Sequence, residues 1–165
     1  MSTTDLGPFS RRTAGVLLHL TSVPGAFGIG DLGPGAHAAL AWIARAGLTW
    51  WQMLPVGPVG PGDSPYASTS SFAGEPLLVA IEWLVEDRLL PPDVLSRVPA
   101  SLRRGPTRYA DAASLKYPLF KRAWETFQSA GGPKTRAWRR FVQRNREWLP
   151  GWRAFTKDET GLHGF

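Results

Sequence analysis

Three carboxylate residues with the chemistry for acid–base catalysis, Asp31, Asp63 and Glu75, fall in Gly- and Pro-rich segments that follow two apolar stretches. Transfer or hydrolysis of a glycosidic bond with retention uses two such acids held about 5–5.5 Å apart. Most acids in loops instead cap a helix or stay solvated, and Asp63 could form an Asx turn or contact Tyr66. Sequence spacing alone therefore assigns no catalytic residue to this chain.

The segment at residues 57–76, GPVGPGDSPYASTSSFAGEP, contains four Gly, four Pro and a single Tyr, Tyr66. So many turn-forming residues usually indicate a surface loop. This loop directly follows the apolar segment WWQMLPV, which favours a buried strand. It is therefore a candidate binding element, because α/β folds bind ligands beyond the carboxyl ends of their strands.

His19 stands near the end of another apolar run, TAGVLLHL. Its place at the carboxyl end of a predicted strand makes it a candidate substrate contact, while a hydrogen-bonded core histidine is the alternative interpretation. The chain has three histidines, His19, His37 and His163. None of them is spaced from another His or acid as metal ligands usually are, so we expect no metal site.

Nucleotide-binding motifs do not fit this sequence. Residues 28–33, GIGDLG, match the dinucleotide fingerprint, but seven residues separate them from the preceding predicted strand. The acid that should follow about 20 residues later is also missing. No phosphate-binding P-loop motif is present, and the lack of Cys excludes disulfides and thiolate chemistry.

Positive charge is concentrated in the second part of the chain. Residues 1–99 contain 5 Lys or Arg and 8 Asp or Glu, whereas residues 100–165 contain 14 and 5. The arginines of residues 134–149 could follow a phosphate backbone, which makes nucleic-acid binding one hypothesis. Aromatic residues share that segment at helical core spacing and no nucleic-acid-binding motif accompanies them, so a solvated helix face is favoured.

The candidate loops need a scaffold, and the sequence predicts a βαβ unit for it. Residues 13–20 and 49–56 are apolar runs typical of parallel strands buried on both faces. Residues 34–47 predict a helix, with Pro34 in its first turn and Gly47 just past its end. A complete eight-stranded α/β barrel takes roughly 250 residues, so we expect the opening of a larger domain.

The remaining chain is predicted to be mostly helical. Residues 76–90 are helical or mixed, and amphipathic helices are predicted at residues 114–128, with Pro118 in the first turn, and at residues 134–149. We expect no regular element in residues 151–165. The sequence contains neither a signal-peptide pattern nor an apolar run that could span a membrane, which predicts a cytoplasmic protein without a membrane partner.

Three long segments, in matching order, resemble a known family. They are AGVLLHLTSVPGAFGIGDLG, WWQMLPVGPVGPGDSPYASTSSFAGEPLL and YADAASLKYPLFKRAWETF. They are similar to segments of the 4-alpha-glucanotransferases, also called amylomaltases or disproportionating enzymes, of glycoside hydrolase family 77. The likeness extends from about residue 13 to residue 149.

The resemblance implies an α/β fold. Residues 13–75 would be the opening βαβ segment of a (β/α)8 TIM-type barrel, and residues 76–165 an inserted, mostly helical subdomain. It implies an enzyme that breaks an α-1,4-glucan bond, holds the glycosyl group on an Asp and transfers it to another sugar without a cofactor. In this family the catalytic acids come from later barrel strands. We therefore expect an incomplete barrel without catalytic residues, whose partners are maltooligosaccharides and the C-terminal part of the same polypeptide.

By the same resemblance, Ser64, Pro65 and Tyr66 lie in the loop after the second barrel strand and line the sugar site. Asp63 and His19 complete the expected substrate-binding residues. A Tyr restrained by a preceding Pro presents an apolar ring face and a hydroxyl at low entropy cost, which suits the C–H face and hydroxyls of a sugar.

Several residues depart from the family pattern. Glu75 stands where the family usually has Asn, and Arg108 where it usually has Asp. Pro61 replaces an aromatic residue that, with one at the position of Tyr109, often contacts glucan outside the active site. A non-catalytic glucan-binding remnant is therefore the first alternative hypothesis, and a basic nucleic-acid-binding protein the second.

Overall fold

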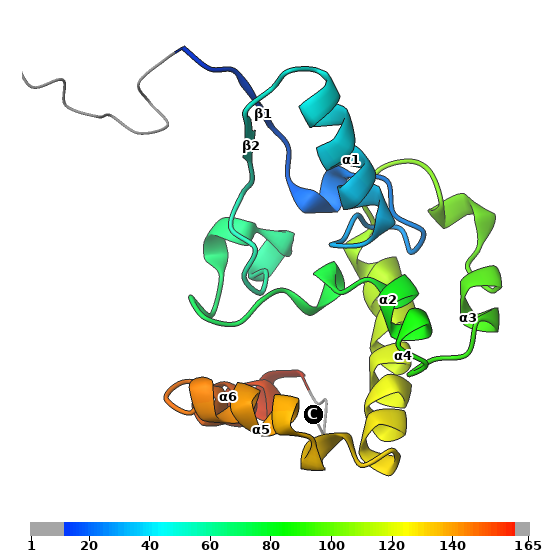
Figure 1. Cartoon of the computed structure of the whole chain (residues 1–165), viewed down its shortest axis with the longest axis vertical. Helices are drawn as coiled ribbons and strands as arrows, with labels where there is room; N and C mark the ends of the chain where they lie inside the picture. The colour runs from blue at the N-terminus through cyan, green and yellow to red at the C-terminus, as the bar shows by residue number, and fades with distance from the viewer. Residues whose placement is uncertain (1–11, 161–165) are drawn as a thin grey trace, which may run out of the picture.

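The computed structural model describes residues 12–160 of the chain. Its sheet consists of two short parallel strands, β1 (Gly15–Leu17) and β2 (Trp50–Gln52), with Gly15 opposite Trp50. Figure 1 shows the two strands side by side at one end of the molecule. A parallel pair requires a crossover between its strands, as the sequence predicted.

Helix α1 (Pro34–Arg45) provides this crossover and begins and ends where the sequence indicates. Pro34 is its first residue, where a missing N–H has no consequence for helical hydrogen bonding. Gly47 follows the cap residue Ala46 with a φ of +72°, a conformation that favours glycine. The predicted strand–helix–strand unit is therefore confirmed.

The prediction that both strands are buried on both faces is wrong. Leu17 is 62% exposed and Trp50 is 38% exposed. Within residues 12–160 no third strand lies beside the pair, so side chains that a larger sheet would bury meet solvent. The first strand is also shorter than predicted, because a 3-10 turn at Leu20–Ser22 follows it.

The middle of the molecule contains α2 (Ile81–Glu86), α3 (Asp93–Ser96) and α4 (Tyr109–Ser129). These helices and the loop after β1 enclose the largest hydrophobic cluster, whose buried members are Phe27, Ile81, Leu90, Val94, Val98, Leu102 and Ala123. Short 3-10 turns connect the elements elsewhere: Leu20–Ser22, Pro61–Asp63, Pro65–Ala67, Pro76–Leu78, Ala100–Leu102 and Gly132–Lys134.

Helix α4 begins five residues before its predicted start at residue 114, and this changes the position of Pro118. Pro118 was expected in the first turn, but it lies inside the helix. A proline there cannot donate the hydrogen bond to the carbonyl of Ser114, four residues earlier. The packing of neighbouring side chains maintains the helix through this position: Lys116 on one side of Pro118 is fully buried, and Leu119 on the other packs against the hydrophobic cluster.

The predicted single helix at residues 134–149 is also wrong, as is the expectation of no element after it. The structure has α5 (Arg136–Arg144) and α6 (Leu149–Thr160), which lie together in Figure 1. The side chain of Asn145 separates them, because it donates a hydrogen bond to the Phe141 carbonyl and accepts one from the Trp148 indole. These local hydrogen bonds compete with continuation of the helix.

Candidate functional site

The loop at residues 57–76 connects β2 to the middle of the molecule and contains two tight turns. The first, Pro61–Asp63, is closed by a hydrogen bond from the Gly60 N–H to the Ser64 carbonyl. A Cβ atom at Gly60 would lie 2.1 Å from the carbonyl oxygen of Ala67, so only glycine allows this close approach. The loop therefore has a defined path despite its length.

The second turn, Pro65–Ala67, presents Tyr66 to solvent. Tyr66 is 74% exposed, the highest value among the large hydrophobic and aromatic side chains of the described chain. Ser64 and Pro65 are half-buried, and Asp63 is exposed with a φ of +57°. The structure thus groups four of the five predicted substrate-binding residues in one loop, with the aromatic ring accessible.

His19, the fifth predicted residue, lies just before the turn that follows β1 and is buried. Its Nδ1 atom has no hydrogen-bond partner within the described chain. Burial lowers the pKa of His19 from its usual 6.5, because the imidazolium form loses hydration there. The structure therefore places His19 at the edge of the core, and a contact with substrate stays a prediction.

Glu75 closes the base of the loop at residues 57–76. Its backbone N–H donates to the Val56 carbonyl at 2.9 Å, and its Oε2 accepts from the Val59 N–H at 2.9 Å. Its Oε1 accepts from the N–H of Leu77 at 3.0 Å, which caps the following turn. Sequence reasoning treated Glu75 as one of several loop acids, but the structure makes it a buried structural residue.

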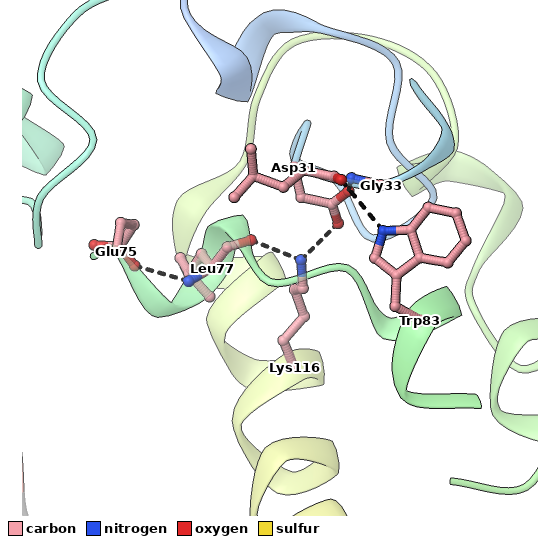
Figure 2. Close-up of polar contacts among 7 residues, drawn as sticks. Asp31, Gly33, Glu75, Leu77, Trp83 and Lys116 are labelled. Carbon is pink, nitrogen blue, oxygen red and sulfur yellow. Dashed lines mark hydrogen bonds and ion pairs between the residues drawn. The ribbon is translucent and has the colours of Figure 1, made fainter. Parts of the chain in front are cut away.

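A buried ion pair joins this region to the loop after β1. Lys116 of α4 is fully buried, and its Nζ donates to Asp31 Oδ2 at 2.8 Å and to the Leu77 carbonyl at 2.6 Å. Asp31 Oδ1 accepts from the Gly33 N–H at the start of α1. Figure 2 shows the ammonium group between the Asp31 carboxylate and the Leu77 carbonyl. Three segments of the chain therefore meet at one cation.

Burial lowers the pKa of Lys116 from its usual 10.5, because the charged form loses its hydration, while the negative charge of Asp31 opposes this shift. The Lys116 ammonium also lies 6.0 Å from the centre of the Phe27 ring, within range of a cation–π contact. Sequence reasoning missed this residue. The sequence feature that could have revealed it is that Lys116 shares one helix face with apolar residues such as Ala112 and Ala123.

Comparison with known proteins decides the family. The sequence profile described as 4-alpha-glucanotransferase matches residues 18–161. The chain belongs to the 4-alpha-glucanotransferase family. The matched range contains Tyr66, Glu75 and Lys116, so the loop and the buried ion pair described above are parts of a 4-alpha-glucanotransferase sequence.

Curated 4-alpha-glucanotransferases from several organisms are similar to this chain. The protein of Thermus thermophilus is 38% identical over 157 residues, which are 93% of this chain and 30% of that protein. The protein of Synechocystis is 40% identical over 119 residues, which are 72% of this chain and 23% of that protein. The chain thus spans less than a third of the length of these 4-alpha-glucanotransferases.

A solved 4-alpha-glucanotransferase structure supports the same fold. The amylomaltase of Streptococcus agalactiae in complex with acarbose superimposes with a TM-score of 0.76 at 28% sequence identity. The match covers 92% of this chain and 30% of that protein. Within residues 12–160, no helix is long and apolar enough to cross a membrane.

A cavity of about 940 Å³ lies beside the Tyr66 loop, between α4 and α6. Its walls include acidic and aromatic residues, among them Asp63, Glu75, Tyr109, Tyr117, Trp152 and Phe155. Phe72 of the loop stacks on Trp148 with ring centres 6.1 Å apart, which joins the loop to the α5–α6 segment. Tyr109, at the first residue of α4, lines this cavity as well.

Proposed function

We propose that this chain is the N-terminal part of an enzyme that transfers α-1,4-glucan segments between maltooligosaccharides with retention of configuration. The observation that carries this proposal is the family match over residues 18–161, a range that contains the exposed side chain of Tyr66. The proposal needs no cofactor and places the protein in the cytoplasm. The catalytic Asp and Glu residues would come from parts of the enzyme outside this chain.

In this proposal Tyr66 contacts the sugar directly. Its exposed ring provides an apolar surface for a glucose C–H face, and its hydroxyl can exchange hydrogen bonds with sugar hydroxyls. Ser64 and Pro65 would restrain the turn that carries Tyr66, and Asp63, which lines the neighbouring cavity, would accept hydrogen bonds from a glucan chain. His19 would contribute from the end of β1.

Residues 13–75 would be the first part of a (β/α)8 barrel and residues 76–165 a helical insertion. The open sheet supports this arrangement, because Leu17 and Trp50 would become buried if further strands and helices of the same polypeptide joined β1 and β2. The partners of this chain would then be its own C-terminal continuation and α-1,4-glucans.

The proposal is tested by incubating the complete polypeptide that contains residues 1–165 with maltotriose. A transferase releases glucose and forms longer maltooligosaccharides, which chromatography separates. Retention is checked by proton NMR of the first products, which should have the α configuration. Binding of maltotriose without any new product would instead favour the glucan-binding remnant, and neither binding nor transfer would contradict the proposed function.

A further inference from the structure

Glu75 connects both ends of the loop that presents Tyr66. On one side, Oε2 accepts from Val59 near the start of the loop, and on the other, Oε1 accepts from Leu77 just after its end. The Glu75 backbone adds a bond to Val56. Glu75 therefore connects the two ends of a loop of about 18 residues, 57–74. A small shift of these hydrogen bonds would move the whole loop, and with it Tyr66.

In this chain a carboxylate matches both hydrogen-bond partners of position 75. Both partners of the Glu75 side chain are backbone N–H groups, and both must find an acceptor oxygen. An amide side chain has one acceptor oxygen, which can bind one of the two N–H groups. Its NH₂ group is a donor, so it cannot accept a hydrogen bond from the other N–H group. Glu75 is only 6% exposed, so a water that replaced the missing acceptor would have to enter from the cavity that Glu75 lines.

The positive charge of Lys116 offsets part of the cost of burying the Glu75 carboxylate. The charge of Glu75 is among those that favour the charged form of Lys116, and the two side chains are connected through one residue. Leu77 donates its N–H to Glu75 and accepts from Lys116 with its carbonyl. Figure 2 shows these contacts in sequence, from Glu75 through Leu77 to Lys116 and Asp31. The loop is therefore fixed to α4 and not only to itself.

We infer that Glu75 is a positioning residue for the glucan site, which holds the loop at residues 57–74 so that Tyr66 meets the substrate in one place. This inference rests on the proposed function. It distinguishes Glu75 from the acids that would react with substrate, because both its oxygens are already bound to backbone N–H groups. Loss of the carboxylate should affect substrate binding more than the chemical step.

The test uses Glu75→Gln in the complete polypeptide that contains this chain, with Glu86→Gln as the control. Glu86 is exposed at the end of α2, so the control makes the same change of charge without touching the loop. For Glu75→Gln we expect amide hydrogen exchange in residues 57–74 to become about tenfold faster. We expect KM for maltotriose to rise about tenfold while kcat changes by less than about twofold.

Glu75→Asp provides a second variant if Glu75→Gln fails to fold. It keeps the charge that compensates Lys116 but is one methylene shorter, so it can reach only one of the two N–H groups and should change KM in the same direction. Unchanged exchange in residues 57–74, or an unchanged KM in both variants, would overturn the inference. No transfer by the unaltered polypeptide would instead overturn the proposed function, which the exchange measurement does not depend on.

Discussion

At the residue scale, the contact between Lys116 and Asp31 is a buried ion pair that connects α4 to the loop after β1. Burial of either charge alone is unfavourable by several kcal/mol, and the pair is stable because each group has further hydrogen bonds. Lys116 also binds the Leu77 carbonyl, and Asp31 also binds the Gly33 N–H. The stability of the region should therefore depend on both partners together.

Replacing Lys116 by Met should destabilise the fold by about 3–5 kcal/mol, because the Asp31 carboxylate is left buried without its cation. The free energy of unfolding is measured by denaturant titration at low micromolar concentration, with Lys121→Met as the control on the exposed side of α4. A combined Lys116→Met, Asp31→Asn variant should lose less than the sum of the two single changes. Equal losses in the Lys116 and Lys121 variants would contradict the account.

His19 should make stability depend on pH. Because burial lowers its pKa below 6.5, the unfolded chain binds a proton at a higher pH than the folded chain does. Stability from neutral His19 is therefore fully present above about pH 6.5 and is lost as the pH falls through the folded pKa. The difference in unfolding free energy between the unaltered chain and His19→Gln should be constant above pH 7.5 and change below pH 6.5. A constant difference over the whole range would show that His19 titrates equally in both states.

At the element scale, α4 contains a local defect that packing overcomes. Pro118 is exposed and lies within the helix, where it leaves the Ser114 carbonyl without its helical donor. The opposite side of the helix contains Ala112, Lys116 and Ala123, which are all buried. Tertiary contacts of the buried face therefore maintain the helix, although Pro118 disfavours a helical conformation.

Substitution of Pro118 by Ala should stabilise the fold by about 1–3 kcal/mol, because it restores a helical N–H without changing the buried face. Lys121→Ala, at another exposed position of α4, should stay within about 0.5 kcal/mol of the unaltered chain. Thermal unfolding followed by circular dichroism measures both. A destabilised Pro118→Ala variant would mean that α4 bends at this residue to make a contact that Ala cannot.

Elements with local signals at both ends could be predicted from the sequence, and elements fixed by distant contacts could not. Helix α1 was predicted correctly because Pro34 and Gly47 determine its ends through their own backbone preferences. Helix α6 was missed because Pro150 and Gly151 suggest a loop, although a proline is compatible with the first turn of a helix. The division between α5 and α6 depends on side-chain hydrogen bonds of Asn145, which hydrophobic periodicity does not reveal.

In the candidate site, too, local features could be predicted from the sequence and contacts between distant residues could not. The Tyr66 loop could be located because its turn residues and its place after a strand are local features. The pair of Lys116 and Asp31 could not be, because 85 positions separate the two residues and only the folded chain brings them together. The role of Glu75 was hidden for a similar reason, since one of its partners, Val59, lies 16 positions away.

At the scale of the whole molecule, the described chain contains a well-packed middle and an open end. The cluster around Phe27 and Ile81 is buried. By contrast, Leu17 of the two-stranded sheet is exposed to solvent, and Trp42 of α1 is 57% exposed. An unpaired sheet edge with apolar side chains is a site for association. In the proposed arrangement, further strands of the same polypeptide would continue the sheet at this open end.

The 165-residue chain alone should therefore self-associate as its concentration rises. Leu17→Lys should reduce this association, because a charged side chain on an edge strand opposes pairing with another edge. Val142→Lys, at an exposed position of α5, is the control and should leave association unchanged. Sedimentation equilibrium measures the effect. A chain that stays monomeric at all concentrations, with or without Leu17→Lys, would contradict the expectation.

The dissociation constant of maltotetraose shows whether the Tyr66 loop binds α-1,4-glucans. The complete polypeptide is titrated by calorimetry beside its Tyr66→Ala and Tyr66→Phe variants. We expect Tyr66→Ala to weaken binding about tenfold or more, and Tyr66→Phe, which keeps the ring, to weaken it less. Equal affinity of the unaltered polypeptide and Tyr66→Ala would contradict the claim.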